Sequence, residues 1–278
     1  MLIVKAFFGA TLGAFVIAGL SSHPTTAAKP AVPPVVTITA RDYSYDPIPD
    51  IPAGVVDLRL NNLGKDVHHA AIFRLRGGHT AAQFLAAIKN PGPPPTWAVP
   101  TPGPNAPAPG ETSNAIAEFA PGSYIVMCFI DTNGGVPHFM KGMTRAFKVI
   151  PSSKGGPAPK ADLDLSLFDY GFKFRTPVTA GSHLIRLTNI SAQVHEVQIL
   201  QLAPGKTAKE LHDWLLTPMT TMPPGKPLGG VMNVAPGAHP EFRMTLTSGH
   251  YVAFCFVPDA KDGKPHFVHG MEWAFEVK

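Results

Sequence analysis

The chain contains two cysteines, and each of them is followed by the same series of potential metal ligands. The first series is Cys128, His138 and Met143, and the second is Cys255, His266 and Met271. A thiolate, an imidazole and a thioether form a set of soft ligands, and the metal that this set suits best is copper. The spacing therefore predicts that both cysteines serve one kind of metal chemistry.

The two series belong to an internal repeat that covers most of the chain. At the offset that separates Cys128 from Cys255, the residues Asp42, Asn62 and His68 recur as Asp169, Asn189 and His195. After the cysteines the offset grows by one residue, which indicates a single insertion in one loop. We expect two units that arose by duplication, residues 35–150 and 161–278. Residues 151–160, rich in proline, glycine and lysine, are typical of a linker.

The N-terminus has the pattern of an export signal. Lys5 precedes an apolar run over residues 6–20, and small residues follow up to Ala28. We therefore expect residues 1–28 to be a signal peptide, and the mature protein to be periplasmic or extracellular, without stable membrane insertion. An uncleaved anchor is the alternative, although the apolar run is shorter than the about 20 residues that a membrane-spanning helix needs.

Composition favours strands and turns over helices. The sequence has 31 prolines and 26 glycines, and only 15% of its residues are charged. The formal net charge of +4 arises without runs of basic or acidic residues. We therefore expect neither a nucleic acid nor an anionic membrane as a partner.

Each unit is predicted to be a small antiparallel β-sandwich with one short helix. Residues 55–60 and 183–187 largely alternate apolar and polar side chains, as half-buried strands do. A threonine begins each of two helical patterns, residues 80–89 and 207–216, where it can act as the N-cap. Residues 91–109 contain many prolines and have no period, so we expect an exposed loop there. The fold class is therefore all-β.

The predicted strands explain how the ligands can meet. Tyr124 and Cys128 lie on one face of a strand, and the recurrence of this tyrosine as Tyr251 indicates that the face points into the sandwich. The histidine and methionine of each series then arrive on the following loop, whereas His68 and His195 lie on a separate strand. Two histidines and a cysteine in a plane, with a weak axial methionine, form the blue-copper arrangement.

Each unit resembles a cupredoxin, the fold of plastocyanin, azurin and the domains of multicopper oxidases and copper nitrite reductases. The resemblance is carried by Asn62…His68, Gly122-x-Tyr124-x-x-x-Cys128 and His138-x-x-x-x-Met143, with their counterparts in the second unit. It implies two tandem Greek-key β-sandwiches. It also implies two type 1 coppers, one bound by His68, Cys128, His138 and Met143, and the other by His195, Cys255, His266 and Met271.

Departures from the family pattern bear on catalysis. The loop between the cysteine and the second histidine is longer than in plastocyanin-like proteins. Phe129 and Phe256 follow the cysteines, whereas nitrite reductases and laccases have a histidine beside the cysteine that carries electrons to a catalytic copper. The His-x-His pairs that build such centres are also absent from the sequence. We therefore expect that the chain is not an enzyme.

The sequence thus favours an exported copper protein that exchanges single electrons with a transient redox partner. The resemblance implies that the loop histidine is the partly exposed ligand through which electrons leave. Copper storage, tolerance or delivery, with a copper donor or acceptor as the partner, is the alternative, and the extra ligands His69, Met140 and His269 are natural features of it. A metal-free interaction module is a third possibility.

Each ligand also has a purely structural interpretation. A lone buried cysteine is more often a small core residue than a ligand, and Met143 or Met271 can be core residues too. A Cys128–Cys255 disulfide is a further alternative, because an even cysteine count in an exported chain often indicates one. The duplicated order of the ligands favours metal binding over these alternatives.

Overall fold

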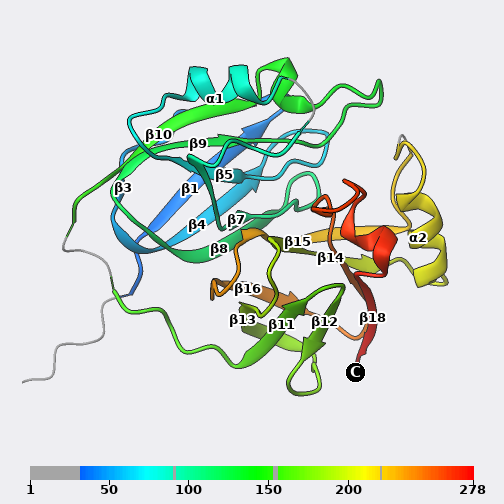
Figure 1. The fold of residues 1–278 in the computed structure, drawn as a ribbon. Coiled ribbons are helices and arrows are strands. Elements are labelled where there is room, and N and C mark those ends of the chain that lie inside the picture. The colour runs from blue at the N-terminus through cyan, green and yellow to red at the C-terminus, as the bar shows by residue number, and fades with distance from the viewer. Residues whose placement is uncertain (1–31, 90–91, 153–155, 220) are drawn as a thin grey trace, which may run out of the picture.

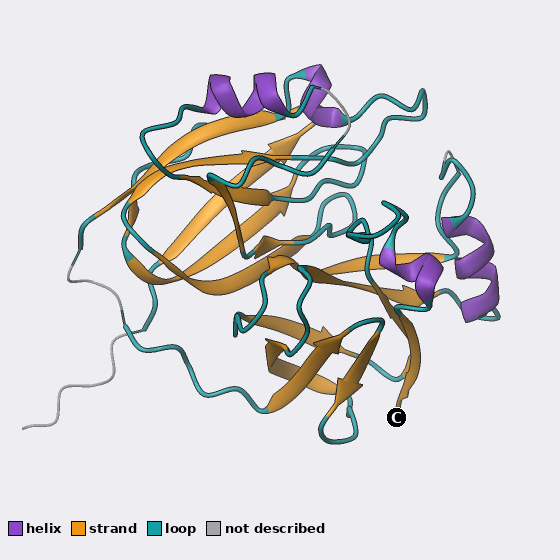
Figure 2. Cartoon of the chain, in the orientation of Figure 1, coloured by secondary structure: helices purple, strands orange, loops and turns teal. Residues whose placement is uncertain are grey.

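A computed structural model describes residues 32–89, 92–152, 156–219 and 221–278. The predicted signal peptide, residues 1–28, lies outside the described residues, as does part of the predicted linker. The described chain consists mainly of β-strands, which confirms the predicted all-β class (Figures 1 and 2). None of its helices is long and apolar enough to span a bilayer.

One eight-stranded sheet runs through both halves of the chain. The first half supplies β1 (Val35–Arg41), β2 (Ser44–Tyr45), β4 (Gly54–Asn62) and β8 (Thr112–Phe119). The second half supplies β11 (Leu163–Phe168), β12 (Gly171–Phe174), β13 (Gly181–Asn189) and β16 (Glu241–Leu246). The strand order is β12-β11-β13-β16-β8-β4-β1-β2, so the halves meet where β8 pairs antiparallel with β16.

A five-stranded sheet completes a sandwich in each half. In the first half its order is β3 (Ile51–Pro52), β10 (Thr144–Ile150), β9 (Gly122–Met127), β5 (Ala71–Leu75) and β6 (Ala98–Thr101). In the second half it is β18 (Glu272–Val277), β17 (Gly249–Phe254), β14 (His195–Leu202), β15 (Gly225–Val234) and β7 (Gly103–Pro104). Because β7 comes from the first half, this sheet is shared as well, and the division into two domains stays a prediction.

Most strand pairs are antiparallel, as expected, but the expectation of antiparallel sandwiches was wrong for some pairs. β1 runs parallel to β4, and β11 runs parallel to β13. Between β1 and β4 the chain crosses to the other sheet at β3, so it re-enters the first sheet in the same direction. The alternation of side chains does not reveal such a crossing, because it is the same in parallel and antiparallel neighbours of a half-buried sheet.

The two predicted helices are confirmed as α1 (Ala81–Ala87) and α2 (Ala208–Leu215). Their N-caps, Thr80 and Thr207, each accept a hydrogen bond from a backbone N–H of the first turn, and the residue there returns a bond to the cap. Phe84 of α1 packs in a cluster with side chains of β5 and β9. The helices therefore cover the outer faces of the five-stranded sheets.

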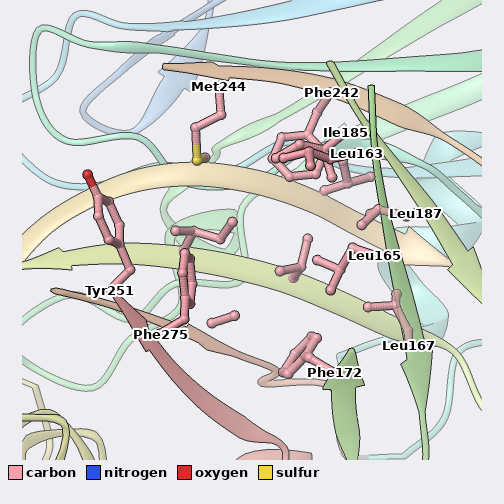
Figure 3. Close-up of a cluster of buried hydrophobic side chains, with 14 of the residues drawn as sticks. Leu163, Leu165, Leu167, Phe172, Ile185, Leu187, Phe242, Met244, Tyr251 and Phe275 are labelled. Atoms are coloured by element: carbon pink, nitrogen blue, oxygen red, sulfur yellow. The ribbon is translucent and has the colours of Figure 1, made fainter. Parts of the chain in front are cut away.

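The strands that precede the cysteines turn alternate residues to opposite layers. Tyr124 of β9 lies in the core of the first sandwich together with Cys128, whereas the next residue, Ile125, faces α1. Tyr251 and Cys255 share the core of the second sandwich in the same way, part of which is drawn in Figure 3. Both tyrosines are 1% exposed, which confirms the predicted inward face.

The expectation of an exposed loop over residues 91–109 was wrong for its second part. β6 pairs with β5, and β7 pairs with β15 of the other half. Residues 103–107 are buried. Both strands lie at sheet edges, where proline is tolerated. The other half of the chain buries this segment, and local sequence does not show that contact.

Two asparagines tie each half to a strand of the other. The side-chain N–H of Asn105 donates to the carbonyl of Val197 in β14, at 3.2 Å. The side-chain N–H of Asn233 in β15 donates to the carbonyl of Ile72 in β5, at 2.9 Å. These two strands directly follow, or contain, the first histidine of each predicted ligand set.

Candidate metal centres

Three predicted ligands of the first half converge at a buried point. Nδ1 of His68 lies 3.1 Å from Nδ1 of His138, which in turn lies 3.5 Å from Sγ of Cys128. The three ligand atoms lie within 4.8 Å of one another, and all three side chains are buried. The fold therefore gathers residues that are far apart in the sequence.

The second half forms the same group of atoms. Nδ1 of His195 lies 3.0 Å from Nδ1 of His266, and Sγ of Cys255 lies 3.5 Å from the latter. All three side chains are 0% exposed. The two halves thus share the geometry of the group and not only its residue types.

The methionine of each series lies where the loop returns to the cysteine. Met143 and Met271 are 0% exposed and belong to the same core clusters as the cysteines. The N–H of Met143 donates to the carbonyl of His138 at 3.0 Å, and the N–H of Cys128 donates to the carbonyl of Met143 at 3.3 Å. The backbone therefore places the methionine beside the other residues, and its role as a ligand stays a prediction.

The loops that carry the second histidines fold back over the cysteines. Each contains a short 3-10 turn, η1 (His138–Lys141) or η2 (His266–His269), which begins at the histidine. The N–H of Phe139 donates to the carbonyl of Cys128 at 2.9 Å, and this bond fixes the turn beside the sulfur. Gly142 has a φ of 103°, a conformation that glycine adopts without a Cβ clash, and the chain reverses there into β10.

Two aspartates hold the first histidines, a role that the sequence analysis missed. Oδ1 of Asp42 lies 2.8 Å from Nε2 of His68, and Oδ1 of Asp169 lies 2.7 Å from Nε2 of His195. A histidine that donates its Nε2–H keeps Nδ1 unprotonated and ready to bind a metal. The only signal of this role in the sequence was the recurrence of the aspartates at the offset of the repeat.

Tyrosines cover the second histidines. The ring centroid of Tyr43 lies 4.6 Å from that of His138, and the centroid of Tyr170 lies 5.3 Å from that of His266. The two histidines are 1% and 0% exposed. The expectation of a partly exposed loop histidine was therefore wrong, because the residue after each aspartate turns its ring over the site.

Two of the residues adjoining the predicted ligands hold the backbone after the cysteine. Nε2 of His69 accepts the N–H of Phe129 at 2.8 Å, and Glu196 accepts the N–H of Phe256 at 2.9 Å. Burial lowers the pKa of His69 to about 3 and raises the pKa of Glu196 to about 7. Both side chains thus fix the first residue of the loop that carries the second histidine.

The other two extra ligand candidates lie at the surface. Met140 is 55% exposed. His269 is exposed too, and its Nε2 lies 3.1 Å from Oδ1 of Asp262. His269, Asp262 and Asp259 form a third group of close donor atoms in the second half.

Burial controls the protonation of both buried groups. It raises the pKa of Cys128 to about 12 and the pKa of Cys255 well above the usual range of a thiol. Burial, together with the nearby first histidine, also lowers the pKa of His138 and of His266 to about 4. At neutral pH the metal-free group is therefore uncharged, with a thiol and neutral imidazoles.

The donor set fits a soft or borderline metal ion. Both cysteines are free, so the alternative of a Cys128–Cys255 disulfide was wrong. Each group offers one sulfur and two imidazole nitrogens, and a carboxylate holds the far side of the first ring, as is usual around metal-binding histidines. Two buried Nδ1 atoms about 3 Å apart also need a proton or a cation between them, since two facing lone pairs repel.

Comparison with known proteins gives structural similarities only. No protein-family model matches this chain, and no curated protein matches it. Reduced auracyanin from Roseiflexus castenholzii is 22% identical, over 44% of this chain and 99% of that chain, with a TM-score of 0.29. The copper-containing nitrite reductase from Thermus scotoductus is 15% identical, over 88% of this chain and 61% of that chain, with a TM-score of 0.24. The blue copper oxidase from Nitrosomonas europaea is 16% identical, over 88% of this chain and 86% of that chain, with a TM-score of 0.26.

The expectation that the chain is not an enzyme is contradicted by these similarities. The similar structures include a copper nitrite reductase, a multicopper oxidase and a laccase from Botrytis aclada, which are enzymes. The expectation rested on Phe129 and Phe256 beside the cysteines and on missing His-x-His pairs. Those patterns describe one way to build a catalytic centre, from ligands that are close in sequence. Residues that the fold or a second subunit brings together need no such pattern.

Proposed function

We propose that this chain is an exported copper-binding protein that carries single electrons through two type 1 copper centres. The first copper would be bound by His68, Cys128, His138 and Met143, and the second by His195, Cys255, His266 and Met271. The observation that carries the proposal is the buried group of two Nδ1 atoms and one Sγ atom, formed once in each half.

The ligand types favour copper over zinc. Zinc accepts thiolate and imidazole, but its sites are completed by further cysteines, histidines, carboxylates or water. Here the buried side chains of His69 and Glu196 accept backbone N–H groups of the loops. A buried thioether, from Met143 or Met271, lies beside each group. A trigonal set of two histidines and one cysteine with a weak thioether is an arrangement specific to copper.

The packing of the groups favours electron transfer. Bound copper would supply a one-electron couple between Cu(II) and Cu(I). The chain's own residues would keep the ligands in one geometry in both states, because Asp42 holds the ring of His68 and backbone hydrogen bonds hold the loop of His138. Ligands that do not move with the charge lower the barrier to each transfer, since little reorganisation accompanies it.

Exposed apolar side chains beside the first centre support a transient partner. Phe129, Val136 and Met140 are 37%, 38% and 55% exposed, and all three lie on the loop that carries His138 or at its start. Val268, which matches Met140 in the repeat, is 41% exposed. We propose that a redox partner docks over these loops for a short time, and that no nucleic acid is involved.

Export and domain structure complete the proposal. The apolar run at residues 6–20 and the small residues up to Ala28 support a signal peptide over residues 1–28. A periplasmic or extracellular location follows from it. The repeat supports two cupredoxin-like domains, residues 35–150 and 161–278, joined by residues 151–160.

Metal analysis with visible and EPR spectra tests the proposal. We expect the copper-loaded protein to bind about two coppers and to show an intense thiolate-to-copper absorption. Cys128→Ser and Cys255→Ser should each remove one copper and its absorption, whereas His250→Ala, a change at an exposed histidine outside both groups, should remove none. A protein that stays colourless and copper-free after loading would refute the proposal.

A further inference from the structure

The two groups differ at the far side of the loop histidine. In the second half, Nε2 of His266 lies 3.4 Å from Oε1 of Gln193, within hydrogen-bond distance. In the first half, Nε2 of His138 is buried and has no hydrogen-bond partner among the described residues. The two loop histidines therefore meet different surroundings, although their Nδ1 atoms face the same kind of group.

One position of the repeat provides the nearer partner in the second half, while Oδ2 of Asp259 lies further away, at 3.8 Å from Nε2 of His266. Gln193 matches Asp66 at the offset of the repeat. The carboxylate of Asp66 accepts a hydrogen bond from the hydroxyl of Tyr43 at 3.0 Å and makes none with Nε2 of the loop histidine. The longer side chain of Gln193 reaches His266 instead, and the hydroxyl of Tyr170 is accepted by another residue of the second half.

Gln193 is itself held in place from both ends of its amide. Its Nε2–H donates to Oδ2 of Asp259 at 3.0 Å, and its Oε1 accepts the N–H of Ala260 at 2.9 Å. This pattern identifies the oxygen as the atom that faces His266, because the nitrogen is engaged with a carboxylate. The loop histidine of the second half therefore finds a fixed acceptor.

The histidine before the cysteine, His68 or His195, also has more hydrogen-bond partners in the second half than in the first. Nε2 of His195 has a second partner, the hydroxyl of Ser191 at 2.7 Å. The matching residue of the first half is Gly64, where an added Cβ would lie 2.5 Å from Nε2 of His68. The glycine therefore leaves His68 with its aspartate partner alone, whereas His195 is held twice.

The presence or absence of an acceptor at Nε2 of the loop histidine matters when the histidine binds a metal. A histidine that binds a metal through Nδ1 must carry its proton on Nε2. At His266 this proton has an acceptor, Gln193. At His138 it would be a buried N–H without an acceptor, and leaving such a donor unpaired is unfavourable because it loses its bond to water without a replacement.

We propose that the second centre retains copper while the first centre releases it, and that Gln193 is the positioning residue that sets the difference. This inference rests on the proposed copper-binding function. Changes in the hydrogen-bond partners of metal-binding histidines typically alter metal affinity by about 10- to 100-fold. We expect the first centre to release copper faster by a factor in this range.

Two single-centre proteins measure the difference directly. The variant Cys255→Ser keeps the first centre, and Cys128→Ser keeps the second. Each is loaded with one equivalent of Cu(II) and then mixed with excess EDTA, and the decay of the thiolate-to-copper absorption gives the release rate. Only an intact cysteine centre contributes this absorption, so the other half does not interfere. We expect the decay to be about 10- to 100-fold slower in Cys128→Ser.

Exchanging the side chains at this position tests the cause. In the Cys128→Ser protein, Gln193→Leu removes the acceptor at similar volume and should speed release about tenfold or more. Gln193→Glu keeps an oxygen at the same reach and should keep release slow. In the Cys255→Ser protein, Asp66→Gln should slow release. Asp66→Asn is the matched control, because its short amide can still accept from Tyr43 but cannot reach His138.

The outcomes separate this inference from the proposed function. Equal release rates in the two loaded single-centre proteins, or a Gln193→Leu rate equal to that of its parent, would overturn the inference and leave copper binding intact. Slower release from the first centre would overturn it as well. Failure of the unmodified protein to take up copper at all would refute the proposed function, and the inference with it.

Discussion

Oδ1 of Asp42 lies 2.8 Å from Nε2 of His68, and this contact decides which nitrogen of the ring faces Cys128. The same relationship recurs between Asp169 and His195 at 2.7 Å. Because the carboxylate accepts the Nε2–H, the lone pair of Nδ1 is left for a metal ion. The aspartate is thus part of each centre, although it touches no metal.

Removing the carboxylate should weaken the first centre alone. We expect Asp42→Ala to lower copper affinity at that centre by about 10- to 100-fold, because the ring of His68 loses the contact that fixes its tautomer. Competition with a chelator of known affinity, monitored in the Cys255→Ser background, measures the change. Asp46→Ala is the control, since Asp46 pairs with Arg41 at the surface. A matching loss in the control would show that the effect is general and not local.

Copper uptake should release protons. Burial raises the pKa of Cys128 to about 12, so the metal-free thiol is protonated at neutral pH, whereas the ligand is the thiolate. We expect about one proton to be released for each copper bound, and affinity to rise about tenfold for each unit of pH. A pH indicator in weakly buffered solution measures the protons. Cys128→Ser and Cys255→Ser should each lower the total by about one proton.

The metal-free protein should lose stability as the pH falls from about 6.5 towards 4. The pKa of His138 and of His266 is about 4 in the folded chain, below the ordinary value of 6.5. Between these values the unfolded chain binds more protons than the folded chain, so each histidine lowers the free energy of unfolding by up to about 1.4 kcal/mol per pH unit. Urea unfolding at pH 7, 6, 5 and 4 checks this. A free energy of unfolding that does not change between pH 7 and 5 would contradict the burial of both rings.

A buried asparagine should anchor the loop that leads to the first histidine of the second half. The side-chain N–H groups of Asn189 donate to the carbonyls of Gln193 and Val234, both at 2.7 Å, and its oxygen accepts the N–H of Ser191 at 2.9 Å. We expect Asn189→Ala to lower the free energy of unfolding by roughly 1–3 kcal/mol, because these groups lose their partners. Chemical unfolding measures it, with the exposed Asn133→Ala as the control. A loss no larger than that of the control would be inconsistent with this network.

The close approach of β7 to the residue before β5, both in the first half, should make Gly103 intolerant of a side chain. A Cβ at Gly103 in β7 would lie 2.2 Å from the carbonyl oxygen of Ala70, which directly precedes β5. Backbone atoms cannot yield as a flexible side chain can, so we expect Gly103→Ala to destabilise the protein by about 1–3 kcal/mol. Thermal unfolding checks this against Gly134→Ala, where the nearest atom lies 3.8 Å away. Equal melting temperatures for the two variants would contradict the packing.

The part of the site that could be predicted from the sequence is the part with a repeated chemical pattern. Cys128, His138 and their counterparts could be identified because soft ligands recur in one order in both halves. The inward face of Cys128 followed from the two-residue period of a strand that also carries Tyr124. Helix starts could be predicted at Thr80 and Thr207, because an N-cap is a local hydrogen bond.

The remainder depended on contacts between distant segments. Tyr43 recurs like a ligand, but nothing in its neighbourhood shows that its ring covers His138. Asn105 lies among prolines that suggest an exposed loop, and only the other half explains its burial. The contact of Gln193 with His266, and the absence of a hydrogen bond between Asp66 and Nε2 of His138, likewise depend on side-chain length across the site and not on local pattern.

In the shared eight-stranded sheet, each half covers a sheet edge of the other. Cutting the chain between the halves would uncover the edges of β8 and β16, which pair at Ile116 and Glu241. An exposed edge strand can pair with a strand of another chain, including an identical copy. We therefore expect either half, expressed alone, to aggregate through its exposed edge strand.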